Sequence, residues 1–318
     1  MKTTGYLGID VGSISTNVVV IDPAAEVLFT AYRRVEGHPI HSVQRAILEM
    51  QAALGDSVEV AGVCTTGSAR SLIGAVVGAD IVKNEISAHA RAALQLHPDL
   101  QTIFEIGGQD SKVTIVRNGV VVDFAMNLVC AAGTGSFLDS QAKRLSLSIE
   151  ELSERALLSQ DPTTIAGRCT VFAESDMIHK QQTGHAQHDI VMGLCHAMVR
   201  NFLGNVCAGK EIKPPVVLQG GVSANQGIRR AFNEALNTQV IIPRHSMVMG
   251  AYGAALIAAK ANPAPTRFRG YGLCEHEIAT RGFRCADCAN RCEIIEIVDG
   301  GQTLGRSGGR CRKWEQQR

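Results

Sequence analysis

Two cysteines occupy positions where a thiol can do chemistry. The stretches NLVCAAGTGSFLDS (127–140) and AGRCTVFAESDMIH (166–179) place Cys130 and Cys169 immediately before helical patterns. A helix start carries partial positive charge and free backbone N–H groups, which lower the pKa of a thiol and stabilise a thiolate ligand. Two thiolates cannot complete a four-cysteine metal site, whereas a symmetric dimer supplies four. The alternative is that both are small buried hydrophobic side chains.

A glycine turn near the N-terminus is the first candidate for phosphate binding. In DVGSIST (10–16), Gly12 lets backbone N–H groups approach a phosphate. Three hydroxyl donors follow it, from Ser13, Ser15 and Thr16. Asp10 would face a metal ion or a water molecule bound to it. A turn of this composition is more often purely structural, so alone it predicts little.

A second turn of the same kind strengthens the interpretation. EIGGQDS (105–111) adds the carboxylate of Glu105 and the glycines Gly107 and Gly108. Two such turns, one in each lobe, can hold a phosphate chain from both sides. The segments NEISAHA (84–90) and GGVSAN (220–225) complete a set of four.

The elements that must position these residues follow a repeated pattern. Strand, glycine turn, strand and strand run from about residue 5 and again from about residue 102. Further strands are expected in the segments SVEVAGVCTTG, PPVVLQ and TQVIIP. In the first helix Val43, Ile47 and Leu48 should share a buried face. Helices are expected over residues 42–54, 84–96, 133–145, 171–182, 188–208 and 246–260. This alternation predicts a mixed α/β sheet in each lobe.

Length and composition set the organisation. The 318 residues, 45% hydrophobic, suffice for two cores. ANPAPTRFRG (261–270) is typical of a linker, with five of the ten cysteines beyond it. We therefore expect a first lobe over 1–98, a second lobe with the two cysteines over 99–262, and a linker with a cysteine-rich, metal-binding tail over 263–318.

Charge and hydropathy exclude several classes of protein. The net charge of +1 gives no reason to expect a nucleic-acid partner. No apolar run is long enough to span a bilayer, and Asp10 interrupts any signal-peptide core. Ten cysteines in a reducing compartment favour metal or redox chemistry over disulfides. A cytoplasmic location is the expectation.

The four glycine-containing segments resemble known motifs. They are similar, in order, to the phosphate-1, connect-1, phosphate-2 and adenosine motifs of the actin/hexokinase/heat-shock-chaperone ATPase superfamily. The resemblance implies two ribonuclease-H-like lobes that bind ATP. It places Mg²⁺ near Asp10 and Glu105, with Glu85 near the metal or water, as the three catalytic carboxylates. MVMGAYGAALIA resembles the closing connect-2 helix, where Gly250 and Gly253 permit close packing. The implied nucleotide contacts are Gly12, Ser13, Ser15, Thr16, Gly107, Gly108, Gln109, Asp110, Gly220, Gly221 and Asn225, with Gly220 and Gly221 against the adenosine.

Residues 1–262 resemble a narrower family, the ATP-dependent activators of 2-hydroxyacyl-CoA dehydratases, with relatives in benzoyl-CoA reductase and double-cubane-cluster reductase systems. VCAAGTGSFLD and GRCTVFAESD carry this resemblance. It implies a homodimer bridged by one [4Fe-4S] cluster, with Cys130 and Cys169 of each chain as ligands. It also implies ATP-driven electron transfer from ferredoxin or flavodoxin to a partner iron–sulfur enzyme. One departure is Asn17, where many members have lysine. Asparagine keeps a hydrogen-bond donor at this position but has no charge.

The tail cysteines have metal-ligand spacing of their own. The predicted ligand set is Cys285, Cys288, Cys292 and Cys311, in which the first three have the spacing C-x2-C-x3-C. Cys274 or His276 are the alternates. The segment resembles one in longer activator-like proteins. Both Zn²⁺ and [4Fe-4S] are possible. A zinc knuckle that only folds the tail and a second, electron-entry cluster therefore both stay open.

Other interpretations also remain. A small-molecule kinase of the same fold, acting on a sugar or a carboxylate, would leave both lobe cysteines unused. A regulatory or chaperone-like ATPase would use the cysteines only as zinc ligands. Cys64, Cys195 and Cys207 are expected in the core. His179, His185 and His188 are expected at a solvated helix end or loop rather than at a metal.

Overall fold

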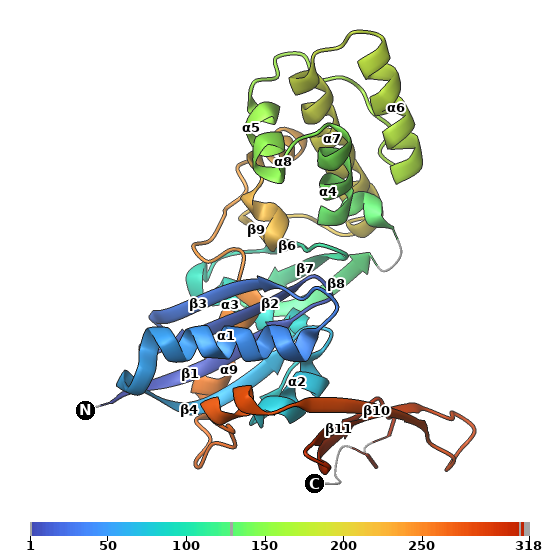
Figure 1. Cartoon of the computed structure of the whole chain (residues 1–318). Helices are drawn as coiled ribbons and strands as arrows, with labels where there is room; N and C mark the ends of the chain where they lie inside the picture. The colour runs from blue at the N-terminus through green and yellow to red at the C-terminus, as the bar shows by residue number, and fades with distance from the viewer. Residues whose placement is uncertain (1, 128–129, 312, 315–318) are drawn as a thin grey trace. The chain divides into compact units, whose positions relative to one another are not determined.

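Two β-sheets with the same strand pattern organise the chain (Figure 1). The computed structural model describes residues 2–127, 130–311 and 313–314. The first unit comprises Met1–Ala92 with Val248–Arg318, and the second comprises Ala93–Met247. The three-part division at residues 98 and 262 remains a prediction about folding units.

The sheet of the first unit has the order β3-β2-β1-β4-β5. β1 pairs antiparallel with β2 and parallel with β4. Its strands are β1 (Thr3–Val11), β2 (Ser15–Ile21), β3 (Val27–Arg34), β4 (Val58–Thr66) and β5 (Ile81–Val82). Leu7, Ile9 and Val11 are buried in one apolar cluster with residues of α1 (Pro39–Leu54) and α2 (Arg70–Val77). These two helices therefore cover one face of the sheet, and α1 runs across it in Figure 1.

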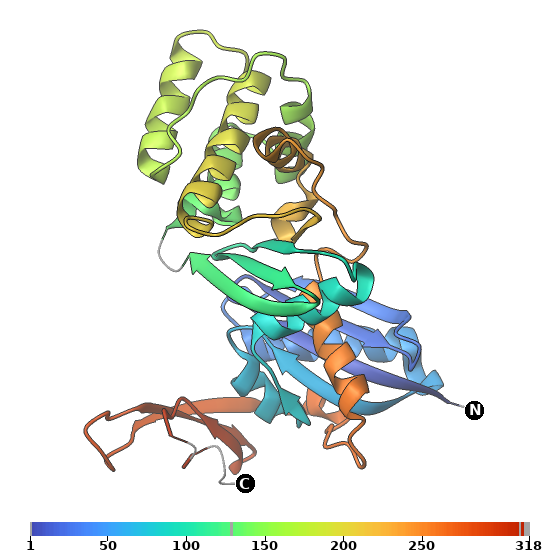
Figure 2. The same cartoon turned by 180° about the vertical axis from the view of Figure 1, so that it is seen from behind.

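The opposite face of this sheet is covered by α9 (Met249–Ala261), drawn in orange in Figure 2. The approach is close because α9 consists largely of glycine and alanine. A Cβ built on Gly8 of β1 would lie 1.9 Å from the carbonyl oxygen of Ala251. A Cβ on Gly253 would lie 1.8 Å from the carbonyl oxygen of Ala88, in α3 (Glu85–Leu96). The predicted close packing at Gly253 is confirmed.

The predicted buried face of the first helix was partly wrong. Val43 and Ile47 are fully buried, but Leu48 is 46% exposed. Ala46 and Met50 complete the buried face instead. At 100° per residue, positions i, i+3, i+4 and i+7 share a helix face, and Leu48 falls outside that stripe.

The second unit repeats the strand pattern of the first, which confirms the predicted duplication. Its order is β8-β7-β6-β9, with antiparallel pairs β6–β7 and β7–β8 and a parallel pair β6–β9. The strands are β6 (Thr102–Ile106), β7 (Ser111–Arg117), β8 (Val120–Asn127) and β9 (Val216–Gln219). The strand predicted over 238–243 forms only one bridge, Val217 to Ile241. Pro243 has no N–H with which to extend the pairing.

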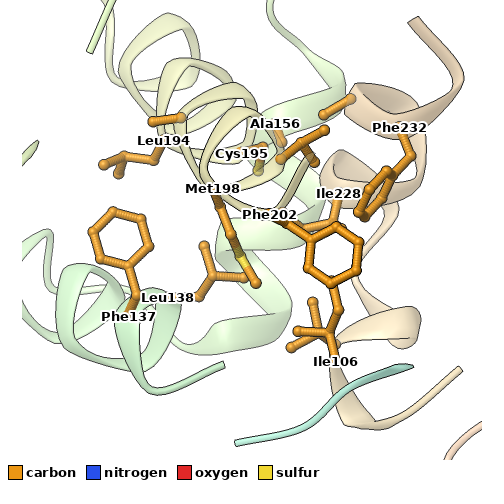
Figure 3. Packing of buried hydrophobic residues seen from close by; sticks show 14 of the residues in the cluster. Ile106, Phe137, Leu138, Ala156, Leu194, Cys195, Met198, Phe202, Ile228 and Phe232 are labelled. Carbon is orange, nitrogen blue, oxygen red and sulfur yellow. The ribbon is translucent and has the colours of Figure 1, made fainter. Parts of the chain in front are cut away.

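Five helices pack over this sheet around an aromatic core. They are α4 (Gly135–Arg144), α5 (Ile149–Leu157), α6 (Thr170–Gln182), α7 (Gln187–Asn201) and α8 (Gln226–Leu236). The ring centroid of Phe202 lies 5.0 Å from that of Phe104. It lies 5.7 Å from that of Phe232, and Figure 3 labels both Phe202 and Phe232. The helices α2 and α5 were not predicted from the sequence. The start of α5 is nevertheless encoded locally, because Ser148 and Glu151 form a reciprocal capping box.

The tail forms a three-stranded antiparallel sheet, β10-β11-β12, which shares the core of the first unit. The strands are β10 (Ile278–Arg284), β11 (Glu293–Asp299) and β12 (Gln302–Ser307). Ile297 is fully buried in the same cluster as α1 and α2, and a Cβ on Gly305 would lie 2.8 Å from Ala75 of α2. The linker is hydrogen-bonded to the buried side chain of Asp80. Its carboxylate accepts hydrogen bonds from the Arg267 backbone N–H and the Thr266 hydroxyl, both at 2.7 Å. The tail is therefore docked on the first unit.

Among the residues that the structure describes, no helix is long and apolar enough to cross a membrane.

Candidate functional site

In the first unit, Asp10 sits in a cradle of glycines beside a histidine. Its carboxylate lies at the end of β1, with Oδ2 3.8 Å from Nε2 of His89. A Cβ on Gly67 would lie 2.4 Å from Oδ1, and a Cβ on Gly250 would lie 2.0 Å from Oδ2. A side chain at Gly250 would therefore displace the carboxylate from this place, and Gly67 also has a positive φ of +86°, which favours glycine. Asp10 and His89 are each 8% exposed, so the carboxylate is held in a defined place.

Glu85 was predicted as a site residue in this region, whereas His89 was not. Both lie on α3, one turn apart, so they share a helix face. The i, i+4 spacing in NEISAHA was the available signal.

The first phosphate turn closes by a hydrogen bond from the Gly12 N–H to the Ser15 carbonyl oxygen, at 2.9 Å. Asn17 pairs with Asp10 across β1 and β2, so the two side chains share a sheet face. Thr16 is fully buried and points to the other face. Thr16 Oγ1 and Asn17 Oδ1 are buried without a hydrogen bond in the described part of the chain. Ser13 is exposed.

The second phosphate turn contains a buried cation between two carboxylates. Lys112 is 1% exposed, and its Nζ lies 3.1 Å from Glu105 Oε1 and 3.0 Å from Asp110 Oδ2. Glu105 and Lys112 are cross-strand partners in β6 and β7. The Gly107 N–H donates to the Asp110 carbonyl oxygen and closes the turn. Lys112 was not among the predicted site residues, because its partnership with Glu105 depends on strand register.

The predicted adenosine segment forms a tight connection after β9. Gly220 has φ +89°, and a Cβ there would lie 2.5 Å from the carbonyl oxygen of Ile106. Asn225 Oδ1 accepts the Ile228 N–H at 3.0 Å and caps α8. Its Nδ2, like Ser111 Oγ and Ser223 Oγ, is buried without a protein partner among the described residues. Buried polar atoms are normally hydrogen-bonded, so these orphaned atoms fit motifs that complete their bonds with a ligand.

The structure brings Cys130 and Cys169 together within the second unit. Cys169 is the N-cap residue of α6. Cys130 precedes a 3₁₀ turn, Ala131–Gly133, and α4 begins only at Gly135. Cys130 Sγ lies 4.0 Å from the carbonyl oxygen of Arg168, the residue before Cys169. Both thiols are half-buried. Two segments far apart in sequence therefore bring their cysteines into one region of the second unit.

Whether these residues fit an iron–sulfur cluster depends on the donor set. No group of three or more His, Cys, Asp or Glu side chains is placed to hold a metal in residues 2–127, 130–311 and 313–314. Two thiols per chain therefore fit a four-thiolate cluster only when a second copy contributes two more.

The predicted tail ligands lie around the β10–β11 hairpin. The Cys285 N–H donates to the Cys292 carbonyl oxygen at 2.8 Å, and the Cys285 thiol contacts Asp287 Oδ2 at 3.3 Å. Lys313 pairs with Asp287, which raises the pKa of Lys313, and the nearby thiols of Cys285 and Cys311 add to this shift. Cys288 and Cys311 are exposed. The fold brings Cys285, Cys292 and the chain near Cys311 into one region without forming a closed ligand group.

The remaining cysteines and histidines behave as expected from the sequence. Burial raises the pKa of Cys64, Cys195 and Cys207 to about 12, as expected of inert core thiols. Cys195 lies among Ala156, Met198 and Ile228 in Figure 3. The histidines at 179 and 185 are exposed and that at 188 is half-buried.

The chain is similar to a family of ATPases and to activators and reductase components within it. The BadF/BadG/BcrA/BcrD ATPase family matches residues 7–258. The (R)-2-hydroxyglutaryl-CoA dehydratase activating ATPase of Acidaminococcus fermentans is 34% identical over 255 residues, covering 80% of this chain and 96% of the relative. A component of the benzoyl-CoA reductase of Thauera aromatica is 29% identical over 183 residues, covering 55% of this chain and 64% of the relative.

A solved structure shows the same actin-like ATPase fold. The activator of the 2-hydroxyisocaproyl-CoA dehydratase from Clostridium difficile, with bound ADPNP, superposes with a TM-score of 0.74 at 32% identity. The match covers 81% of this chain and 95% of the activator. The tail beyond residue 258 lies outside the family match.

Proposed function

Because the chain belongs to the BadF/BadG/BcrA/BcrD ATPase family, we propose that it is an ATP-hydrolysing activator that passes low-potential electrons to a partner iron–sulfur enzyme. The observation that carries this proposal is the contact of the Cys130 thiol with the segment just before Cys169, in the same unit as the second phosphate turn. A protein that only transferred phosphate would not need this pair of half-buried thiols.

The carboxylates and turns are assigned to nucleotide binding. Asp10, fixed by its glycine cradle, would hold Mg²⁺ or one of its water ligands. Glu85 and Glu105 would orient the water and the metal. The turns at 12–16 and 107–110 would donate N–H and hydroxyl groups to the phosphates. The buried cation Lys112 lies between Glu105 and Asp110 and places positive charge in the second turn. At the corresponding place in the first turn the side chain is the uncharged Asn17.

The two thiols are assigned to a shared cluster. Cys130 and Cys169 from each of two copies would hold one [4Fe-4S] cluster across a homodimer. Such a cluster supplies a one-electron carrier of low potential. The donor would be a ferredoxin or flavodoxin. The acceptor would be a 2-hydroxyacyl-CoA dehydratase, an aryl-CoA reductase or a double-cubane-cluster protein, in keeping with the names of the relatives from A. fermentans and T. aromatica.

The test is anaerobic purification with iron, sulfide and zinc analysis, and EPR of the dithionite-reduced protein with and without ATP. We expect the bridging cluster to contribute about four irons per dimer, apart from any iron in the tails, and to give an ATP-dependent EPR signal. Cys130→Ala and Cys169→Ala should lose the cluster and keep ATP binding. Cys207→Ala, a buried cysteine of the same unit, should keep both and serves as the control. Full iron content in both ligand variants would refute the ligand assignment.

A small-molecule kinase is the alternative function, and the same preparation separates the two. A kinase would transfer phosphate to a small acceptor at full rate without iron. Zinc but no iron in the anaerobic protein would favour the kinase or a regulatory ATPase.

For the tail, we propose a second metal site formed by Cys285, Cys288, Cys292 and Cys311. The ligand spacing and the position of three of these cysteines around one hairpin support it. The thiols must move inward to close the site, since they do not converge in the described structure. Zinc in the tail would predict about four irons per dimer in total, and an iron–sulfur cluster in each tail would predict about twelve. If Cys288→Ala keeps the zinc and iron content of the wild-type protein, the proposed tail site is wrong.

A further inference from the structure

The second phosphate turn is hydrogen-bonded to the start of α4. The N–H groups of Gly135 and Ser136 donate to the carbonyl oxygens of Gly107 and Gly108, at 2.9 and 2.8 Å. The Ser136 hydroxyl donates to the same Gly108 oxygen at 2.5 Å. The free N–H groups of a helix start thus bind the backbone of the turn rather than a ligand. Any shift of this turn must move the start of α4 with it.

Asn127 ties Cys130 to the same turn. It is the last residue of β8, and its cross-strand partner is Ser111, the first residue after the turn. Asn127 Oδ1 accepts the Cys130 N–H at 2.9 Å, and Nδ2 donates to the Cys130 carbonyl oxygen at 2.5 Å. One amide therefore holds both backbone polar groups of the cysteine.

Asn201 holds the other cysteine segment. It is the last residue of α7 and is 3% exposed. Its Nδ2 donates to the carbonyl oxygen of Gly167 at 2.6 Å and reaches that of Arg168 at 3.5 Å. These two residues directly precede Cys169.

The two asparagines meet at one glycine. A Cβ on Gly133 would lie 3.0 Å from Asn201 Oδ1, 3.6 Å from Asn127 Nδ2 and 3.7 Å from Ser111 Oγ. Asn201 Oδ1 is buried without a hydrogen-bond partner in the described chain. Both cysteine segments and the end of the phosphate turn are therefore packed around this position.

We propose that Asn127 and Asn201 are positioning residues that fix the separation of the Cys130 and Cys169 thiols and link it to the second phosphate turn. The proposal rests on the proposed function. When nucleotide moves the turn, β7 and the start of α4 move with it, and the two amides carry that movement to the cysteines. If the asparagines merely stabilised loops, their removal would lower stability without changing how the thiols respond to nucleotide.

The test uses the full-length protein without iron, with all thiols reduced. The alkylation rates of Cys130 and Cys169 by iodoacetamide are followed by peptide mass spectrometry, with and without ADPNP. In the wild type we expect nucleotide to change both rates by at least about threefold, because exposure controls thiol reactivity. Asn127→Ala should abolish the change at Cys130, and Asn201→Ala the change at Cys169, with ADPNP affinity retained.

Two further variants make the result decisive. Asn233→Ala removes an amide that accepts the Val240 N–H at 2.8 Å in the same unit, and it should keep the wild-type response. Asn127→Asp keeps the acceptor for the Cys130 N–H and loses the donor to the Cys130 carbonyl oxygen, so the ADPNP-dependent change at Cys130 should be intermediate. If Asn127→Ala does not fold, Asn127→Asp takes its place as the test. A nucleotide response that survives in Asn127→Ala and Asn201→Ala, or is absent from the wild type, overturns the proposal. If the wild-type protein does not bind iron, the proposed function is refuted. The positioning role is still supported in that case if the asparagine variants alone lose the ADPNP-dependent change in alkylation rate.

Discussion

Two glycines one turn apart on α9 should give opposite results when each is changed to alanine. In Gly250→Ala the new Cβ would lie 2.0 Å from Oδ2 of Asp10 and 2.8 Å from Nε2 of His89. Both are ends of side chains, which can swing away. In Gly253→Ala the new Cβ would lie 1.8 Å from the oxygen and 2.6 Å from the carbon of the Ala88 carbonyl group. That group is backbone in the first turn of α3, and it can retreat only if the helix shifts.

The magnitudes follow from these distances. Relieving the contact at Gly250 moves the Asp10 carboxylate by about 1 Å, and a misplacement of that size costs on the order of 100-fold in kcat. Stability should change little, since alanine is favoured over glycine within a helix by up to about 1 kcal/mol. At Gly253, overpacking against backbone should cost about 1–3 kcal/mol of unfolding free energy. For a protein of this size that lowers Tm by several degrees, at about 2–4 °C per kcal/mol.

The assay is ATP hydrolysis under saturating MgATP, together with thermal unfolding of the same preparations. We expect Gly250→Ala to keep the wild-type Tm and to have a lower kcat for ATP hydrolysis. We expect Gly253→Ala to have a lower Tm, with a kcat close to wild type at temperatures where it is folded. Wild-type kcat in Gly250→Ala would mean that the position of the Asp10 carboxylate does not limit the reaction. An unchanged Tm in Gly253→Ala would contradict the close packing of α9 on α3.

Three further predictions concern other parts of the chain. His89→Gln should lower kcat roughly 10- to 100-fold with little change in ATP affinity, because Asp10 loses its buried neighbour; a rate equal to wild type would contradict this. Asp80→Asn should loosen the linker, since hydrogen bonds to a charged group contribute about 1.5–3 kcal/mol, and limited trypsin digestion should then cut faster within 261–270 than in the wild type. The Cys195 thiol has a folded pKa of about 12, above an unfolded value of about 8.5. Its contribution to stability is therefore complete below about pH 8.5 and is lost as pH rises toward 12, by about 1.4 kcal/mol per pH unit. Urea titrations in reductant should show a smaller loss between pH 8 and 10 for Cys195→Ala than for the wild type.

Features that depend on neighbours in sequence were predictable. The duplicated strand–turn–strand pattern follows from alternating apolar residues and glycine turns, and β1–β3 and β6–β8 both form as expected. The small-residue helix was recognised from its composition, and the contact of Gly253 with α3 bears that out. The helix α5, whose N-cap is Ser148, was not predicted although its capping box lies within four consecutive residues of the sequence.

Features that depend on register or on layer packing were not predictable. The partnership of Glu105 with Lys112, and of Ser111 with Asn127, exists because β6, β7 and β8 pair in one register out of several possible. A shift of one residue would turn these side chains to the other face. The prediction for Leu48 failed for a different reason. Leu48 lies outside the i, i+3, i+4, i+7 stripe that begins at Val43, and helix periodicity by itself excludes it from that face.

The sequence alone determined the kinds of chemistry in this protein: carboxylates beside glycine turns, two cysteines next to helical segments, and the family to which these motifs belong. Such patterns are short, and their meaning is set by backbone geometry within a few residues. Only the tertiary structure decided which groups meet. It placed His89 beside Asp10, Lys112 between two carboxylates, and Asn127 and Asn201 around the cysteine segments. Those contacts join residues up to 79 positions apart in the case of Asp10 and His89, and strand register and helix packing, rather than local preference, select them.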